Sequence, residues 1–411
     1  MNNEQNVNNT PILELKNVRQ YFQSGFGKNK VVVKAVHNVS FDVKKGEVFG
    51  LVGESGCGKT TTGRSVIKLY NITDGTIVFK GTPISQGVRT YKQNIKDLKQ
   101  QIVTLKKNNA EEIAELKGDL SLQDKNISSA KATTDEIEKV NRTVQEKIAL
   151  LNQQIAENMQ KIKEAKVINK RNRELMDKMQ MIFQDPIDSL DPRLTVREII
   201  AEGMYINGIS NKEYIDKKVN EALELVGLLP DHAGRYPHEF SGGQRQRIGI
   251  ARALVVNPEL IIADEPISAL DVSIQAQIIN LLNDIRHQMG LSILFIAHNL
   301  SVVKFFCDRI GVMYYGRLVE IATAEELFKH PLHPYTKSLL SAVPLPDPDY
   351  EKNRKRIFYN PRLRPYSEDK PLMTEIRPGH FVYASLDELA RYEKELNGET
   401  VEPDPTLIEL D

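Results

Sequence analysis

The sequence predicts an α/β fold built on a parallel β-sheet with helices on both faces, joined to a smaller antiparallel sheet. Three observations support this prediction. Continuous apolar runs at 48–52, 260–263 and 292–297 are typical of buried parallel strands, and helical stretches separate the later ones. Residues 39–43 alternate between apolar and polar, as in a half-exposed antiparallel strand. Residues 85–178 differ in composition and carry a helical apolar spacing, which indicates an inserted helical hairpin.

Composition excludes several classes of protein. The chain has 411 residues, with 55 Lys and Arg against 55 Asp and Glu, so no overall positive charge draws it to nucleic acid. Its two cysteines, Cys57 and Cys307, are too few for a disulfide framework and fit a reducing cytoplasm. The polar start, residues 1–10, has no signal-peptide pattern, and no apolar run approaches the ~20 residues that cross a bilayer.

The elements of the core follow in order. Strand-like runs at 13–15, 31–33, 39–43 and 48–52 precede a helix expected from Lys59 to about Tyr70, and a strand is expected at 76–79. After the insertion we expect strands at 179–183, 260–263 and 292–297. Helices are expected at 196–206, 212–226 and 272–289, with another beginning near Gly242. From residue 331 prolines become frequent, which marks a C-terminal extension.

The inserted segment, residues 85–178, contains no proline, and Lys, Gln, Asn and Glu predominate. Its apolar positions between Ile137 and Ile162 step by three or four residues, which keeps one stripe on one face of a nearly straight helix. We therefore expect two helical arms of ~40 residues, projecting ~60 Å, with the tip within 118–129. A charged, partly disordered linker is the alternative, because the apolar stripe is thin.

A glycine-rich loop follows the buried strand at 48–52 and opens a helix. Residues 53–60 fit the pattern G-x4-G-K-[ST], whose backbone N–H groups curve around phosphate oxygens at a helix N-terminus. Lys59 is expected to reach the terminal phosphates, and the Thr60 hydroxyl to bind Mg²⁺. The predicted ATP-binding residues are Gly53, Glu54, Ser55, Gly56, Cys57, Gly58, Lys59, Thr60 and Thr61. The helix N-terminus should also lower the pKa of Cys57, so that thiol reagents inactivate the protein and ATP protects it.

Two acids end the apolar run at 260–263. Asp264 is expected to bind Mg²⁺ and Glu265 to polarise an attacking water. Taken alone, the pair is more typical of an ordinary strand end with solvated carboxylates.

Residues 240–247, Phe-Ser-Gly-Gly-Gln-Arg-Gln-Arg, resemble the signature motif of ATP-binding cassette (ABC) ATPases. The resemblance implies a P-loop NTPase core with an antiparallel β subdomain and a helical subdomain, in which the signature completes the ATP site of a second subunit. It implies catalytic roles for Gln184, Glu265 and His298, a magnesium contact for Gln184, and stacking of adenine on Phe22. An ordinary strand aromatic remains the alternative for Phe22. The signature residues are Ser241, Gly242, Gly243 and Gln244, and the D-loop residues are Ser268, Ala269, Leu270 and Asp271.

Further stretches resemble the oligopeptide and dipeptide importer subfamily, among them 183–193, 235–240, 274–277 and 333–336. That resemblance implies an ATP- and Mg²⁺-dependent subunit bound peripherally to the cytoplasmic side of the cell membrane. Its partners would be a second, similar ATPase in a heterodimer, two integral membrane permeases and an extracytoplasmic peptide-binding protein, with no nucleic acid. No iron–sulfur cluster is expected, because no cysteine follows Cys307.

The implied organisation is a polar tail at 1–11, a nucleotide-binding domain at 12–84 and 179–330, the inserted hairpin at 85–178 and the extension at 331–411. Three alternatives stay open at this point. One is a coiled-coil ATPase of the Rad50 or SMC sort acting on nucleic acid, although Gln184 follows the hairpin here and precedes the coiled coil in those proteins. Another is an ABC ATPase for a different solute such as nickel. The third is a regulatory module that holds ATP without turnover, which would predict loss of Glu265 or His298.

Overall fold

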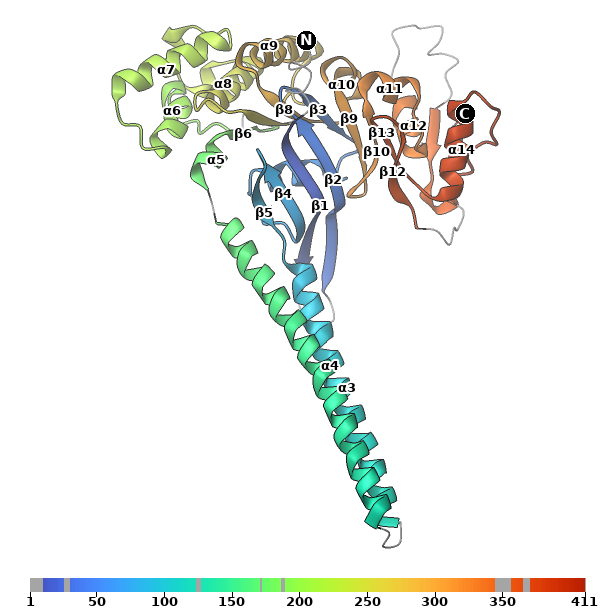
Figure 1. The fold of residues 1–411 in the computed structure, drawn as a ribbon. Coiled ribbons are helices and arrows are strands. Elements are labelled where there is room, and N and C mark those ends of the chain that lie inside the picture. The colour runs from blue at the N-terminus through green and yellow to red at the C-terminus, as the bar shows by residue number, and fades with distance from the viewer. Residues whose placement is uncertain are drawn as a thin grey trace, which may run out of the picture.

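The computed structural model describes residues 10–25, 30–122, 127–170, 172–185, 189–343, 356–364 and 370–410 (Figure 1). Most of the predicted polar tail, the centre of the hairpin tip, Pro186 and the proline cluster at 344–348 lie outside these residues. Among the helices that the structure describes, none has both the length and the hydropathy to span a bilayer.

An eight-stranded sheet forms the centre, in the order β12-β13-β10-β9-β3-β8-β7-β6. Four of its strands, β6 (Met179–Ile182), β7 (Leu260–Asp264), β8 (Ser292–Ala297) and β3 (Val48–Val52), run parallel, and β9 (Arg309–Tyr314) runs parallel to β3. Every residue of β3, β7 and β8 is buried, as their continuous apolar sequences predict. The remaining strands, β10 (Arg317–Thr323), β13 (His380–Ala384) and β12 (Leu372–Arg377), are antiparallel.

A four-stranded antiparallel sheet of order β2-β1-β4-β5 packs against this centre. It comprises β1 (Pro11–Ser24), β2 (Val31–Lys44), β4 (Asp74–Phe79) and β5 (Thr82–Gln86). Its inward face and one face of the large sheet share a core that includes Leu13, Val39 and Leu51. The predicted antiparallel subdomain is thus confirmed.

A helical subdomain follows β6. It contains α6 (Val196–Ile206), α7 (Lys212–Leu225), two short 3₁₀ turns, η2 (Pro230–Gly234) and η3 (Pro237–Glu239), and α8 (Gly242–Leu254). Thr195 caps α6 through a box with Glu198, and Ser241 caps α8 in the same way with Gln244. The eight-stranded sheet is covered on both faces. Helix α2 (Lys59–Val66) packs on the face toward the antiparallel sheet, and α9 (Val272–Met289) and α10 (Leu300–Phe306) pack on the opposite face.

Two long helices, α3 (Arg89–Leu122) and α4 (Ile127–Ile168), run antiparallel as a hairpin that projects away from the body (Figure 1). The short α5 (Arg173–Asp177) returns the chain to β6. Asn169 ties the two legs together at the base, because its side-chain amide makes hydrogen bonds of 2.8 Å with both the N–H and the carbonyl of Gln86. Lys68 adds a hydrogen bond of 3.0 Å to the Asn169 carbonyl.

The C-terminal extension contributes strands to the large sheet. Val382 and Phe381 of β13 pair with Glu320 and Ile321 of β10. Helix α11 (Ala324–Lys329) lies just before the extension, which also contains α12 (Pro334–Ser341), α14 (Leu386–Leu396), η4 (Pro361–Leu363) and a two-stranded sheet of β11 (Arg356–Tyr359) with β14 (Leu407–Leu410).

Several element boundaries differ from the predicted ones: β1, β2 and β4 are longer than the predicted runs, and β6 and α7 each end one residue earlier. Two further differences have a clear local cause or consequence. Helix α2 ends at Val66 and not near Tyr70, because Lys68 takes a left-handed conformation (φ 60°) and Leu69 N–H closes the end on the Arg64 carbonyl. Strand β7 extends one residue further than predicted, so that Asp264 is itself a buried strand residue.

Candidate functional site

The loop between β3 and α2 curves so that its backbone forms a cradle. Gly53 has φ 149° and Gly58 has φ 107°, conformations that favour glycine. A Cβ on Gly53 would lie 2.2 Å from the Met313 carbonyl, and one on Gly58 would lie 2.1 Å from the Ala35 carbonyl. Both glycines are therefore required by close backbone approach, and α2 begins directly after them with its N-terminal amides free to meet an anion.

Lys59 places its charge inside this loop. The side chain is 3% exposed, and Nζ donates hydrogen bonds of 2.7 Å to the Gly53 carbonyl and 2.9 Å to the Glu54 carbonyl. An ammonium held against two carbonyls beside a helix N-terminus makes a concentrated positive site for phosphate oxygens.

A cavity of about 370 Å³ opens over the loop. The predicted catalytic residues meet the phosphate loop there, since Gln184, Glu265 and His298 line the cavity with loop residues. The complete lining is Ala35, Ser55, Gly56, Gly58, Lys59, Thr60, Thr61, Gln184, Glu265 and His298. Gly53, Glu54 and Cys57 belong to the loop but do not line the cavity.

Glu265 is the centre of the polar cluster at the cavity. Its Oε2 accepts a hydrogen bond of 3.2 Å from Gln184 Nε2 and lies 2.9 Å from His298 Nδ1. Its backbone is left-handed (φ 46°), which is costly for a residue with a side chain. Glu265 N–H donates to the Ile296 carbonyl and Ser268 donates to the Glu265 carbonyl, so both sides of the peptide hold this conformation.

Asp264 lies below the cavity, and its donor set fits a divalent cation. Its Oδ1 accepts a hydrogen bond of 2.8 Å from the Thr60 hydroxyl, whereas its buried Oδ2 has no hydrogen-bond partner. Arg64 Nε lies 3.9 Å from that oxygen. Burial raises the pKa of Asp264, and the hydrogen bond from Thr60 opposes the shift. A carboxylate oxygen that accepts no hydrogen bond, on a side chain bonded to the Thr60 hydroxyl, supplies the hard-oxygen chemistry that Mg²⁺ prefers.

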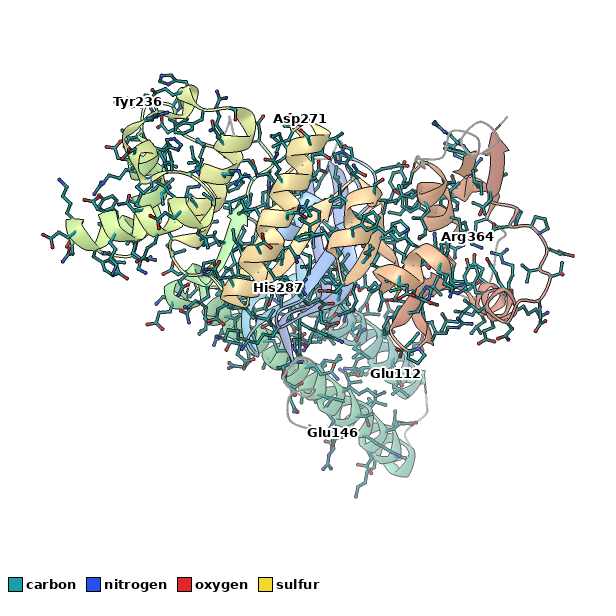
Figure 2. All side chains as sticks on the ribbon, turned by 90° about the horizontal axis from the view of Figure 1, so that it is seen from above. Glu112, Glu146, Tyr236, Asp271, His287 and Arg364 are labelled. Carbon is teal, nitrogen blue, oxygen red and sulfur yellow. The ribbon has the colours of Figure 1, made fainter. Side chains whose placement is uncertain are left out.

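The signature and D-loop residues lie apart from this cavity. Ser241 and Gly242 are exposed at the N-terminus of α8, and Gly243 is buried under Ile274 of α9. Asp271 caps α9 by accepting from Ile274 N–H at 3.0 Å, and Leu270 approaches Gly242. Figure 2 shows Asp271 at the start of α9 and His287 near its other end. The signature and D-loop residues therefore lie next to each other. Ser268 and Ala269 lie between Asp271 and Glu265 in the chain, so the D-loop leads from the cavity to the signature residues.

The sequence-based expectation for Cys57 is wrong. The thiol is 6% exposed, and burial raises its pKa, although Lys59 with Nζ 3.8 Å from Sγ acts in the opposite direction. Position 57 faces the core behind the loop rather than the cavity, so desolvation outweighs the helix terminus. We therefore no longer expect rapid modification by thiol reagents.

Phe22 is placed beside Tyr70, with the rings edge to face at 5.3 Å, and is partly exposed. It does not line the cavity described above, so adenine stacking on Phe22 stays a prediction.

Sequence reasoning missed a contact from the C-terminal extension. The Tyr335 hydroxyl accepts a hydrogen bond of 3.0 Å from the Glu54 backbone N–H in the phosphate loop, and its ring packs with Tyr314 and Tyr359. Tyr335 is 2% exposed, and burial raises its pKa well above the ordinary value. The stretch His333-Pro334-Tyr335-Thr336 was only a family marker in the sequence, because nothing in it shows which loop it touches.

Known proteins resemble this chain in both its ATPase part and its C-terminal region. A family model described as ABC transporter matches residues 36–159 and 137–268. The oligopeptide transport ATP-binding protein OppF of Bacillus subtilis (strain 168) is 46% identical over 383 residues, covering 93% of this chain and 98% of that protein. The chain belongs to the ABC transporter ATPase family.

Three further likenesses accompany this ABC ATPase assignment. The dipeptide transport ATP-binding protein DppF of Lactococcus lactis subsp. cremoris (strain MG1363) is 42% identical over 386 residues, covering 93% of this chain and 97% of that protein. Residues 319–367 match the model described as the oligopeptide/dipeptide transporter C-terminal region. Among solved structures, cbiO1 from Clostridium perfringens, part of the ABC transporter complex cbiONQ, aligns with a TM-score of 0.49 at 20% identity, covering 78% of this chain and 91% of that one.

The predicted family and fold class are thereby confirmed. The Rad50- or SMC-like alternative is not favoured, since the relatives are transport ATPases over nearly their whole length.

Proposed function

We propose that this ABC ATPase energises a membrane importer for oligopeptides by binding and hydrolysing ATP in the cavity over the phosphate loop. The observation that carries the proposal is the convergence of Glu265, Gln184 and His298 on the mouth of that loop. The cargo is inferred from the relatives, which are named for oligopeptide and dipeptide transport. An importer for nickel or another solute would use the same ATP hydrolysis but would need different permeases and a different binding protein.

In the proposed mechanism the loop amides and Lys59 hold the phosphates, and Glu265 orients a water for attack on the terminal one. His298, half exposed beside the Glu265 carboxylate, would bond the terminal phosphate and hold Glu265 in position. Thr60, Asp264 and Gln184 would hold Mg²⁺, which supplies charge neutralisation for the phosphates when bound. The strained backbone of Glu265 keeps its carboxylate aimed into the cavity.

The N-terminus of α8, where Ser241 and Gly242 are exposed, supports a two-subunit site. The serine hydroxyl, the glycine amides and the helix N-terminus suit a phosphate, yet they do not line the cavity of their own chain. We infer that they complete the ATP site of a second, similar ATPase subunit in a heterodimer, while the partner's signature completes this one. ATP binding would then close the pair and hydrolysis would reopen it.

The complete importer would contain this chain and its partner ATPase on the cytoplasmic side of the membrane, two integral membrane permeases and an extracytoplasmic peptide-binding protein. This chain would be peripheral, held through the permeases. The segment 85–178 would be an insertion in its nucleotide-binding domain.

The proposal is tested by capturing the complex. Glu265→Gln should bind ATP without hydrolysing it and so trap the closed pair with its membrane partners. Affinity purification in mild detergent with ATP, followed by mass spectrometry, should recover a second ABC ATPase and two multi-span proteins. Lys59→Ala, which removes the phosphate contact, is the matched control and should recover less of the partner ATPase. Recovery of soluble partners alone would contradict the importer.

A further inference from the structure

The half of the α3–α4 hairpin nearest the body has an unusual surface. Eight lysines there are exposed, and none has a carboxylate within ion-pair distance among the residues that the structure describes. One of them, Lys161, lies on one side of the hairpin, and the other seven lie on the opposite side. These seven are Lys92, Lys96, Lys99 and Lys106 on α3 and Lys163, Lys166 and Lys170 on or just after α4.

These lysines share one side of the hairpin. On α3 the contact with α4 is made by the row that includes Leu98 and Ile102, and at 100° per residue the four lysines lie about 60–140° from the middle of that row in one rotational sense. On α4 the contact row includes Ile155 and Ala165, and the three lysines lie about 60–120° from its middle in the same rotational sense. Because the helices are antiparallel, equal rotation from the seam brings both sets to the same side. We call this set of seven lysines the basic face.

The opposite side of the same region is not basic. A shallow groove there is lined by Asp97, Gln100, Gln101, Thr104 and Leu105. On α4, Glu157 and Glu164 accept hydrogen bonds from Gln153 and Gln160. The charge is therefore one-sided, in a protein whose net charge is +0.

Large apolar side chains stand between the lysines. Val103 of α3 is 66% exposed and Met159 of α4 is 51% exposed. Exposed apolar groups flanked by lysines with flexible stems are typical of surfaces that lie on a bilayer, where the stems cover apolar surface and the ammonium groups meet headgroups.

We propose that the basic face docks on the anionic headgroups of a lipid bilayer. Membrane is favoured over nucleic acid because the cations are all lysines, without the guanidinium fork that binds phosphates in pairs. The only aromatic residue of the two helices is Tyr91, so no platform for stacking bases is present on the basic face. The hairpin would thus give the ATPase a membrane contact of its own, beyond any contact through permeases.

The test is flotation of the full-length protein with vesicles of equal parts phosphatidylglycerol and phosphatidylcholine, against vesicles of phosphatidylcholine alone. The variant Lys92→Gln/Lys96→Gln/Lys99→Gln removes three charges from the basic face. The control Gln100→Glu/Gln101→Glu/Thr104→Glu changes the net charge by the same amount on the opposite side. Soluble ATP hydrolysis, measured for all three proteins, should be equal and shows that each is folded.

We expect binding to the anionic vesicles only, a loss on the order of a hundredfold in the lysine variant at low salt, and a much smaller loss in the control. Binding should also weaken in 0.5 M salt, where the screening length is a few ångströms. Equal binding by the two variants, no binding by the unmodified protein, or equal binding to both kinds of vesicle would overturn the proposal. Tighter binding to single-stranded RNA than to vesicles, lost with the same lysines, would overturn it in favour of nucleic acid. Failure here leaves the importer standing, because permease capture does not depend on these lysines.

Discussion

The two appendages of the ATPase, the α3–α4 hairpin and the C-terminal extension, are attached in opposite ways. The extension adds strands to the central sheet, buries the Glu320–His380 pair at the junction and reaches the phosphate loop through Tyr335. Among the residues that the structure describes, the hydrogen bonds that join the hairpin to the body lie near its base, at Asn169, Gln86 and their neighbours. Figure 2 shows the contrast, with Arg364 set within the extension and Glu112 and Glu146 on the projecting hairpin. We infer that the extension is coupled to the stability and nucleotide site of the body, whereas the hairpin tolerates change.

The largest effect is expected at the junction with the extension. Glu320 and His380 are both fully buried, with Nε2 2.8 Å from Oε1. His380→Ala leaves the carboxylate with only the Leu332 and His333 amides, and should cost about 3 kcal/mol of stability. Thermal unfolding followed by circular dichroism measures the loss. The hairpin control Arg142→Ala breaks an exposed pair with Glu146 and should cost no more than about 0.5 kcal/mol. Equal losses would remove the contrast between the appendages.

A pH effect of intermediate size is expected from His333. Burial lowers its pKa from 6.5 to about 3, and its Nδ1 accepts a hydrogen bond from Tyr335 N–H at the start of α12. Because the unfolded chain binds this proton more readily, stability is complete above pH 6.5 and falls as the pH drops toward 3, by about 2 kcal/mol at pH 5. His333→Asn keeps a capping side chain without the titration, so its melting temperature should fall less between pH 7 and pH 5. A parallel decline in both proteins would assign the pH dependence to other groups.

Tyr335 offers a smaller and more local effect. Tyr335→Phe keeps the ring but leaves the Glu54 N–H without its acceptor, at a cost of about 1–2 kcal/mol. We expect a several-fold rise in KM for ATP with little change in kcat, measured by steady-state hydrolysis. Tyr392→Phe is the control, since that hydroxyl lies within the extension and has no hydrogen-bond acceptor there. Unchanged KM in Tyr335→Phe would mean that the extension touches the loop without positioning it.

The smallest effect is expected inside the hairpin. Asn109 and Asn141 meet across the seam at 3.0 Å, in an otherwise apolar row. Replacing both with Leu exchanges one hydrogen bond for apolar contact, so hairpin stability should change by less than about 1 kcal/mol and ATP hydrolysis should stay the same. Circular dichroism melting and a hydrolysis assay test this. A loss of hydrolysis would show that the hairpin is coupled to the site after all.

The same contrast explains what could be predicted from sequence. Strands β3 and β8 and helices α6 and α9 match the predicted bounds, because continuous apolar runs and strong caps mark them locally. The site residues were predicted as a set because their motifs occur in a known order, and their meeting at one cavity follows from the sheet topology. Two contacts could not be predicted, those of Tyr335 with Glu54 and of Asn169 with Gln86. Each joins segments that lie far apart in the chain, and each uses a backbone group that the sequence does not mark. The pKa of Cys57 was predicted wrongly because sequence shows the helix terminus but not the burial.

The double hydrogen bond between Asn169 and Gln86 has a practical consequence for measuring motion. Because this pair of hydrogen bonds joins the chain just before α3 to the chain just after α4, we expect the hairpin to rotate as a rigid body together with the ATPase. Glu112 lies ~35 Å along α3 from the base, so a rotation of the body by about 10° sweeps that position through about 6 Å. A spin label or fluorophore there, paired with one on the second ATPase, would convert each opening and closing of the proposed dimer into a distance change large enough to follow in real time.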